Sequence, residues 1–232
     1  MIPGTLYIVA TPIGNLEDIT LRALRVLKEC DIVAAEDTRV TGNLLKHFGI
    51  EKKLTSYHEY NKEGKGNYLL ELLLSGKNVA VVSDAGTPCI SDSGWLLVAE
   101  AAKRGVKAVA VPGPSAVVAA LSISGLDTDR FIFLGFLKKK PSKKRKELEA
   151  YKGSKLPVVF FESPYRIMDT LDDIKTVYGD CFISLAREIT KKFEEVVRGT
   201  PDEVKARFKD GKVLGEFCVV VKQSEPEKEA EE

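Results

Sequence analysis

Short apolar runs alternate with longer amphipathic segments through the first half of the chain. The short runs, which predict strands, are residues 6–10, 32–35, 79–82 and 108–111. Apolar residues recur at helical spacing in the segments between and beside them, namely residues 20–30, 42–48, 67–75 and 95–104. Strands that alternate with helices predict a mainly parallel sheet covered by helices.

The turn Pro112-Gly113-Pro114-Ser115 introduces a second half with a different pattern. Strands are predicted there at residues 131–137, 157–161, 181–186, 194–198 and 214–221. Helices are predicted at residues 115–124 and 166–178. Two more are predicted, one that follows the basic segment and ends at residue 151, and one after a capping box that starts at Thr200. We therefore expect an α/β chain of two α/β domains, residues 1–113 and 114–222. The acidic stretch 223–232 predicts a disordered tail.

The loop most suited to bind a ligand is residues 83–94, with the sequence SDAGTPCISDSG. It follows the strand at 79–82, and open α/β sheets bind ligands at the carboxyl ends of their strands. Its glycines, hydroxyls and carboxylates favour a functional loop over a simple connection.

A second loop, residues 11–15 (TPIGN), follows the first predicted strand. It does not match GxGxxG, and GxxxxGK[ST] occurs nowhere in the chain, so the usual dinucleotide and P-loop sites are disfavoured. Contact with another ligand and a plain turn are equal alternatives for this loop.

Charged clusters also follow predicted strands, at residues 36–39 (EDTR), 162–166 (ESPYR) and 187–192 (REITKK). Each cluster alone is compatible with a surface turn or an internal ion pair. Several clusters at the ends of strands together predict a polar ligand site.

Composition and charge narrow the class of protein. The chain has 232 residues, of which 44% are apolar and 30% charged, as in ordinary globular proteins. The basic segment 138–146 (KKKPSKKRK) favours a phosphate-rich partner over a merely solvated loop. The cysteines form no CxxC pair and the two histidines no metal pattern, so we expect no metal and a reducing, cytoplasmic location. No apolar run reaches the ~20 residues that span a bilayer, so no membrane is expected.

Six motifs in order across residues 4–222 carry a resemblance: ATPIGNLEDIT, AAEDTR, SDAGTPCISDSG, VPGPSA, FFESPYR and AREITKKFEE. Together they resemble the ribosomal RNA small subunit methyltransferase I family, in the tetrapyrrole (corrin/porphyrin) methylase superfamily. The resemblance implies two α/β domains of the tetrapyrrole methylase type, an S-adenosylmethionine (SAM) cleft between them, and a homodimer. It also implies 2′-O-methylation of a cytidine ribose in small-subunit rRNA, either naked or in the assembled subunit.

The resemblance also implies which residues contact SAM. Carried over by matching motif, they are Ile13, Gly14, Asp84, Ala85, Gly86, Thr87, Ile90, Ser115, Ala116, Glu162 (or Ser163), Ala186 and Gly215. Glycine suits such positions because backbone there must approach the ligand without a Cβ in the way.

Methylation of a ribose hydroxyl requires an aligned acceptor and removal of its proton. Asp37 or Glu188 could accept the proton, and Arg39, Lys191 or Lys192 could stabilise the developing alkoxide or bind phosphate. Two alternatives stay open on the same fold. One is a SAM-dependent methyltransferase acting on a tetrapyrrole or another small molecule, and the other is an RNA-binding assembly factor without activity.

Overall fold

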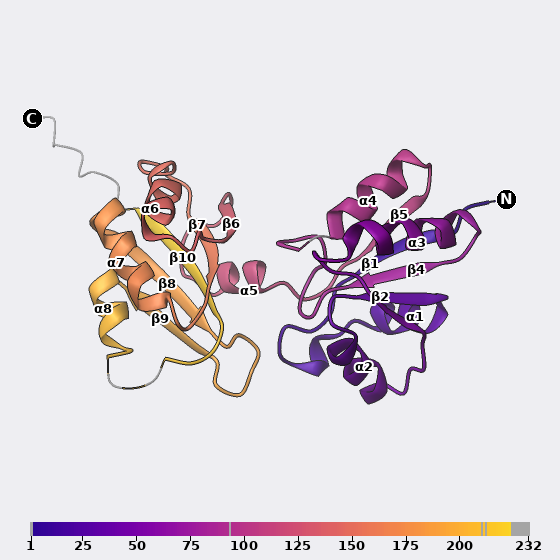
Figure 1. Cartoon of the computed structure of the whole chain (residues 1–232). Helices are drawn as coiled ribbons and strands as arrows, with labels where there is room; N and C mark the ends of the chain where they lie inside the picture. The colour runs from indigo at the N-terminus through magenta and orange to yellow at the C-terminus, as the bar shows by residue number, and fades with distance from the viewer. Residues whose placement is uncertain (1, 93, 210, 212, 224–232) are drawn as a thin grey trace, which may run out of the picture. The chain divides into compact units, whose positions relative to one another are not determined.

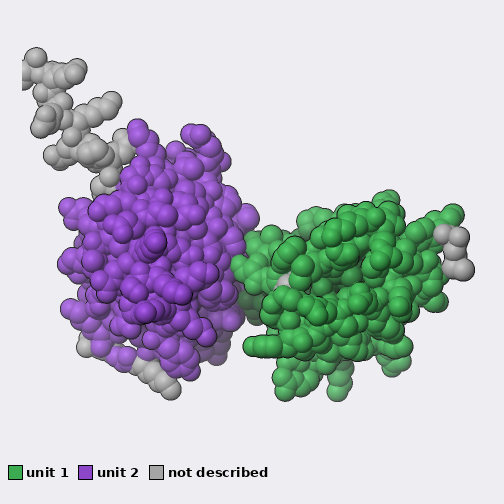
Figure 2. Space-filling view, turned by 45° about the horizontal axis from the view of Figure 1, so that its top comes forward, with its two compact units in different colours: residues 1–115 green, residues 116–232 purple. Residues whose placement is uncertain are grey.

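The chain forms two compact units, residues 1–115 and 116–232 (Figures 1 and 2). The computed structural model describes residues 2–92, 94–209, 211 and 213–223. The division between the units falls two residues after residue 113, the predicted boundary. Of the predicted disordered tail, only Gln223 lies within the described residues, where it ends the last strand.

Unit 1 is built on a five-stranded sheet in which every pairing is parallel. The strands are β1 (Thr5–Val9), β2 (Ile32–Ala35), β3 (Leu54–Ser56), β4 (Val79–Val82) and β5 (Lys107–Val111), in the spatial order β3-β2-β4-β1-β5. All residues of β2 and β4 are buried, as expected for central strands of a sheet that is covered on both faces. The predicted parallel sheet is therefore confirmed.

Helices cover both faces of this sheet (Figure 1). On one face α1 (Leu21–Glu29) and α2 (Thr38–His47) pack against Val33, Ala80 and Val82. On the other face α3 (Lys62–Leu74) and α4 (Gly94–Lys103) pack against Ile32 and neighbouring strand residues. A short 3-10 helix, η1 (Leu16–Asp18), precedes α1. Because side chains alternate along a strand, β1, β2 and β4 each contribute to both clusters.

The structure differs from the sequence predictions for unit 1 in three elements. Strand β3 was not predicted, since its three residues are too short for a pattern. Helix α2 begins at Thr38 rather than at residue 42, because Asp37 accepts the Arg39 backbone N–H at 2.8 Å and caps it. Helix α3 begins at Lys62, five residues before the predicted start, although Gly64 and Gly66 lower its helical propensity.

Unit 2 contains a second five-stranded sheet, which is mostly antiparallel. Its strands are β6 (Ile132–Phe136), β7 (Val158–Glu162), β8 (Cys181–Arg187), β9 (Glu195–Gly199) and β10 (Phe217–Gln223), in the order β6-β7-β10-β8-β9. Strands β7 and β8 both run antiparallel to β10, so their carboxyl ends share one edge with the start of β10. Two of the predicted charged clusters therefore lie at the same edge of this sheet.

Helices again cover the two faces of the unit 2 sheet. Helices α6 (Pro141–Glu149), α7 (Ile167–Tyr178) and α8 (Pro201–Ala206) pack with Phe160, Ile183 and Val219 on one face. Helix α5 (Ala116–Ser122) packs with Val159 and Cys218 on the other. The predicted capping box at the start of α8 is confirmed, since Thr200 and Glu203 cap each other's backbone.

The basic segment 138–146 is only partly a solvated surface. Lys144 is 2% exposed, and its Nζ lies 2.9 Å from Asp173 Oδ2 and 2.8 Å from Thr170 Oγ1. Arg145 Nε donates to Asp173 Oδ1 at 2.7 Å. The interpretation of the whole segment as a phosphate-binding surface is therefore wrong for Lys144, because a buried cation is stable only when it is paired. The ion pair of Lys144 with Asp173 therefore links α6 to α7.

Two further features follow from the described residues. Cys30, Cys89, Cys181 and Cys218 are free thiols, and three of them are buried. Among the helices that the structure describes, none combines the length and the apolar character needed to cross a bilayer.

We expect Lys144→Met to destabilise unit 2 by about 3 kcal/mol, because the buried Asp173 would lose one of its two cationic partners. The matched control is Lys146→Met, which removes an exposed lysine of the same helix and should change stability by no more than ~0.5 kcal/mol. Urea unfolding monitored by hydrogen exchange of peptides from residues 141–178 measures the effect. Equal midpoints for the two variants would show that the buried pair contributes nothing.

Candidate functional site

The carboxyl edge of the unit 1 sheet has the topology of a ligand site. Strands β1 and β4 are neighbours, but the connection after β1 leads to α1 on one face and the connection after β4 leads to α4 on the other. The two loops therefore diverge at a topological switch point, which is where open α/β sheets bind ligands.

Three predicted cofactor loops meet at this edge. Thr11 and Gly86 exchange backbone hydrogen bonds of 2.9 and 3.1 Å, which join the loop after β1 to the loop after β4. Thr87 Oγ1 donates to the carbonyl of Pro114 at 3.3 Å, which adds the loop after β5. Gly86 has φ +79°, and a Cβ there would lie 3.3 Å from Ile13 Cγ2. The structure thus brings together the predicted contacts Ile13, Gly14, Ala85, Gly86, Thr87 and Ser115.

Asp84 connects these loops to the end of β2. Its Oδ1 accepts the backbone N–H of Asp37 at 2.9 Å, and its own N–H points to Glu36 Oε2 at 3.4 Å. Ile90, another predicted contact in the same loop, is 51% exposed and presents an apolar surface. Asp84 is thus hydrogen-bonded to the charged cluster at residues 36–39, which contains the predicted catalytic residue Asp37.

Asp37 and Arg39 form a close ion pair. Arg39 Nη2 lies 2.5 Å from Asp37 Oδ2, and Arg39 Nε also donates to the same carboxylate. These hydrogen bonds lower the pKa of Asp37 to about 2. Asp37 therefore remains ionised at neutral pH and accepts hydrogen bonds, but it holds a proton weakly. The Arg39 side chain is 88% exposed and can reach a phosphate or an oxyanion.

Glu36, the residue before Asp37, has the opposite electrostatic environment. Desolvation raises its pKa, and the negative charges of Asp84 and Asp92 raise it further, while the Asp84 N–H and His58 act against these effects. Of the adjacent carboxylates at the end of β2, Glu36 is therefore the one that binds a proton more readily. The linear pattern of residues 36–39 does not show burial and therefore gave no reason to prefer Glu36 over Asp37.

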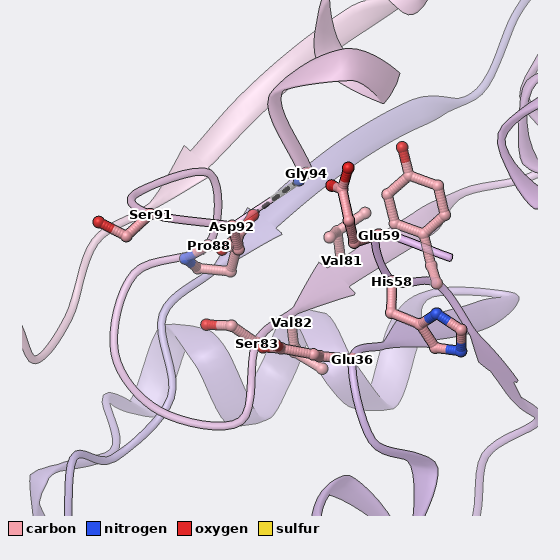
Figure 3. A pocket seen from close by; sticks show the side chains of 11 residues that line it. Glu36, His58, Glu59, Val81, Val82, Ser83, Pro88, Ser91, Asp92 and Gly94 are labelled. Atoms are coloured by element: carbon pink, nitrogen blue, oxygen red, sulfur yellow. Dashed lines mark hydrogen bonds between the residues drawn. The ribbon is translucent and has the colours of Figure 1, made fainter. Parts of the chain in front are cut away.

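A pocket of about 330 Å³ lies at the ends of β2, β3 and β4, beneath the loop at 83–94 (Figure 3). Glu36, Tyr57, His58, Ser83, Pro88 and Asp92 contribute to its lining. Ser83 belongs to the wall of the pocket, and the next residue is Asp84, so the pocket adjoins the predicted cofactor loop.

Asp92 shapes the loop over this pocket. Its carboxylate accepts the backbone N–H of Gly94 at 2.6 Å, dashed in Figure 3, and that of Cys89 at 2.8 Å. Cys89 and Ser91 adopt left-handed backbone conformations, with φ of 72° and 65°. Such conformations are costly for residues other than glycine and persist where the surroundings hold them. Asp92 therefore caps the start of α4 and holds the preceding loop.

Tyr57 and His58 line the pocket but were not predicted as site residues, since the histidines form no metal pattern. They follow β3, and without that strand nothing in the sequence places them at the carboxyl edge. The only sequence signal for them was the segment Leu54–Ser56, a possible short strand, followed directly by the rings of Tyr57 and His58.

The predicted catalytic residues of unit 2, Glu188 and Lys191, form a second ion pair at the shared ends of β8 and β10. Lys191 Nζ lies 2.9 Å from Glu188 Oε1 and 2.8 Å from Glu216 Oε2. Burial raises the pKa of Glu188, but the hydrogen bonds from Lys191 and the Glu216 N–H outweigh it, so the pKa is lowered. Burial lowers the pKa of Lys191, and the two carboxylates outweigh it, so that pKa is raised.

Gly215 provides the space for this pair. It has φ +100°, and a Cβ at this position would lie 2.6 Å from Glu188 Cγ. Glu188 itself is left-handed, with φ 51°. Among the predicted SAM contacts, Gly215 thus has a role within unit 2 that requires glycine whatever it binds.

Two other predicted contacts of unit 2 have buried side chains. Glu162 is 2% exposed, and its oxygens accept hydrogen bonds from Thr170 Oγ1 at 2.8 Å and from the Ser163 N–H at 2.8 Å, beside an ion pair with Arg166. Ala186 is 1% exposed in β8, and Ala116 begins α5. The carboxylate of Glu162 is therefore occupied by partners within its own unit.

Comparisons with known proteins agree with this architecture. The model of the tetrapyrrole (corrin/porphyrin) methylases matches residues 5–205. The ribosomal RNA small subunit methyltransferase I of Halalkalibacterium halodurans is 49% identical over 229 residues, which are 99% of this chain and 79% of that protein. The protein of the same name from Thermotoga maritima is 46% identical over 222 residues, which are 96% of this chain and 100% of that protein.

Solved structures of lower identity share the fold. A uroporphyrin-III C-methyltransferase from Thermus thermophilus superposes with a TM-score of 0.65 at 21% identity, over 94% of each chain. A cobalt precorrin-4 methyltransferase gives a TM-score of 0.69 at 18% identity, also over 94% of each chain. At these identities the likeness concerns the fold alone.

We expect Glu36→Gln to stabilise unit 1 at pH 7. A carboxyl whose pKa is raised by folding favours the native state only while it is protonated, and this contribution is lost as pH rises through the native pKa. The neutral amide avoids that loss, so its advantage should vanish near pH 4, about where an unfolded Glu is half protonated. Thermal unfolding followed by the single tryptophan, Trp95 in α4 of unit 1, measures the difference at both pH values.

The control for this experiment is Glu59→Gln in the same pocket. Glu59 pairs with Lys62, so its substitution should give no stabilisation at pH 7. A Glu36→Gln variant no more stable than the wild type at pH 7 would contradict the assigned environment of Glu36.

Proposed function

Since this chain belongs to the tetrapyrrole (corrin/porphyrin) methylase family and, within it, to the ribosomal RNA small subunit methyltransferases I, we propose that it methylates small-subunit ribosomal RNA with SAM as methyl donor. We further propose that the acceptor is the 2′-hydroxyl of a cytidine. The observation that carries the proposal is the near-complete match to relatives named for this activity. The comparison with porphyrin and precorrin methyltransferases supports a shared fold only, so rRNA is preferred over a tetrapyrrole as substrate.

The loops at the carboxyl edge of unit 1 fit a cofactor such as SAM. Gly86 with its left-handed backbone and the exposed Ile90 leave backbone and apolar surface at the crevice, and Asp84 places a carboxylate beside them. A carboxylate suits a ligand that carries an ammonium and a sulfonium. When bound, SAM supplies an electrophilic methyl group. The contacts predicted in unit 2, Ala186 and Gly215 among them, stay predictions of the family resemblance.

The ion pairs support a role for each predicted catalytic residue in this proposal. Asp37 and Glu188 are ionised at neutral pH, so each can accept a hydrogen bond from the ribose hydroxyl and orient its oxygen toward the methyl group. With SAM bound, transfer of its methyl group to the ribose oxygen would break the sulfur–methyl bond and release S-adenosylhomocysteine. The hydroxyl proton would leave toward such a carboxylate and pass on to water. Arg39 or Lys191 then stabilises the negative charge that develops on the oxygen.

Exposed cations support an RNA substrate. In the basic segment, the side chains other than Lys144 lie on exposed residues, and Arg39 adds an exposed guanidinium in unit 1. Lys and Arg side chains that neutralise RNA phosphates make the affinity for RNA fall steeply as the salt concentration rises.

We also propose that the chain forms a homodimer and works in the cytoplasm. The free thiols fit a reducing compartment, and sedimentation velocity of the full chain tests the dimer.

We expect one methyl group to be transferred from SAM to small-subunit rRNA and recovered as 2′-O-methylcytidine. The measurement incubates the chain with labelled SAM and either small subunits or naked rRNA, followed by nuclease digestion and mass spectrometry. Binding of the RNA should weaken steeply as salt rises from about 50 to 200 mM, whereas a porphyrin would respond little. Normal SAM binding with no methyl group on any rRNA would refute the proposal.

We expect Asp37→Asn and Glu188→Gln each to lower kcat by about a hundredfold or more, because a positioned proton acceptor contributes on that scale. The Kd for SAM should change little in either variant. Single-turnover methylation and equilibrium dialysis with SAM separate the two effects. Glu100→Gln, which removes a carboxylate from a surface pair on α4, is the control and should leave both quantities unchanged. Unchanged turnover in both site variants would remove both residues from the chemistry.

A further inference from the structure

Exposed aromatic side chains gather at the edge of the unit 2 sheet where β6, β7 and β8 end. Phe136 is the last residue of β6 and is 58% exposed. Tyr165 follows β7 and is 88% exposed, and Phe193, in the loop between β8 and β9, is 68% exposed. The other exposed aromatic residues of unit 2, Phe131 and Phe182, lie at the opposite edge and are less exposed. Single exposed apolar side chains are ordinary, but several at one edge of a sheet indicate an interaction surface.

The pairing of the strands brings these three positions to one edge. Strand β6 runs parallel to β7, and both β7 and β8 run antiparallel to β10, so β6, β7 and β8 all end on the same side of the sheet. Phe217, which starts β10, pairs with Glu162 at the end of β7 and with Arg187 at the end of β8. The edge from β6 to β8 spans three strand spacings, which is about 14 Å.

The loop after β7 is held in place beside Tyr165. The Arg166 guanidinium pairs with the buried Glu162 and donates to the carbonyl of Leu137 at 3.2 Å. The second of these contacts joins the loop after β7 to the loop after β6, which continues into Lys138. Tyr165 is therefore exposed on a fixed turn beside the basic segment.

The loop after β8 holds Phe193 by its own hydrogen bonds. The Glu194 carboxylate accepts the Thr190 N–H at 2.5 Å, and the Glu194 N–H donates to the carbonyl of Lys191 at 3.1 Å. Lys192 Nζ lies 5.7 Å from the centroid of the Phe193 ring. An apolar ring and a cation are thus presented side by side.

The charges at this edge favour a polyanionic partner. Glu188, Glu195 and Glu216, carboxylates of the same edge, are each paired with a cation. Four exposed lysines have no carboxylate partner among the described residues, and they lie in the loop after β6 or beside Phe193: Lys138, Lys139, Lys140 and Lys192. Rings that alternate with free cations fit a chain of planar bases and phosphates, which is single-stranded nucleic acid.

We propose that this edge of unit 2 binds unpaired RNA bases next to the methylated nucleotide, by stacking them on Phe193 and Tyr165, an inference that rests on the proposed rRNA methylation. Bases within a duplex are already stacked on each other, so only a single-stranded or splayed segment can use these rings. An edge of this width takes roughly two or three nucleotides. The predicted catalytic pair of Glu188 and Lys191 lies in the same loop as Phe193, so the bound strand passes that pair.

The test measures binding of the full chain to the labelled single-stranded rRNA segment that surrounds the mapped methylated nucleotide. We expect Phe193→Ala and Tyr165→Ala each to raise the Kd about tenfold, because stacking of a base on an aromatic side chain contributes on that scale. Phe193→Tyr keeps a ring and should bind like the wild type, whereas Phe193→Leu keeps only apolar bulk and should bind like Phe193→Ala. Phe182→Ala removes an exposed ring from the opposite edge and is the control, with an unchanged Kd.

Removal of single bases from the RNA shows whether the contact is stacking. When one base at a time is replaced by an abasic ribose, the position that stacks on Phe193 should cost the wild type about tenfold in affinity and cost Phe193→Ala nothing further. Lys192→Gln should reduce the slope of log affinity against log salt by about 0.7, as expected for one phosphate contact to a single strand.

The outcomes separate the stacking surface from the methyltransferase. Unchanged RNA affinity in both alanine variants, while the wild type methylates rRNA, would overturn the surface and leave the methyltransferase intact, as would the lack of any abasic position coupled to Phe193. Loss of SAM binding in either variant would overturn it by assigning the ring to the cofactor. Dissociation of a dimer in sedimentation velocity would overturn it by assigning the ring to a second copy of the chain. If the wild type methylates no rRNA, the proposed function itself fails.

Discussion

The parallel pairing of β4 with β1 and β2 is the constraint on which the candidate site depends. Parallel strands have all their carboxyl ends at one edge, and the hydrogen bonds between Thr11 and Gly86 then hold two loops together that lie more than seventy residues apart in sequence. The buried interior of the sheet keeps this edge rigid. The loops can therefore present glycine backbone, hydroxyls and carboxylates in one place, which no single segment of the chain could do.

The carboxylates at this edge differ because of their neighbours rather than their residue type. Asp37 lies against Arg39 and has a low pKa, whereas Glu36 is desolvated near Asp84 and Asp92 and has a raised one. Glu188 in unit 2 resembles Asp37, since Lys191 keeps it ionised. At this edge, one carboxylate is thus kept ionised by a cationic partner, while the adjacent one has its charged form disfavoured by desolvation.

Charge in unit 2 has a structural and a surface part. Lys144 forms a buried ion pair with Asp173, and Glu162 belongs to a buried network with Thr170 and Arg166. These contacts fix α6 and α7 on the sheet, because breaking one partner of a buried pair is costly. The remaining cations of residues 138–146 lie on exposed positions, where an RNA phosphate can reach them.

The sequence by itself determined the described strands other than β3, most helices, the parallel sheet of unit 1 and the loops that carry the six motifs, because apolar periodicity and loop chemistry are local properties. Only the tertiary structure decided which polar residues share a site. Strand β3 is too short for its sequence to predict it, yet it brings Tyr57 and His58 to the edge of the sheet beside Glu36. Burial, which a linear pattern does not contain, placed Lys144 and Glu162 inside unit 2 and separated the roles of Glu36 and Asp37. Pairing and desolvation arise between segments distant in sequence, and they decide what each charged side chain can do.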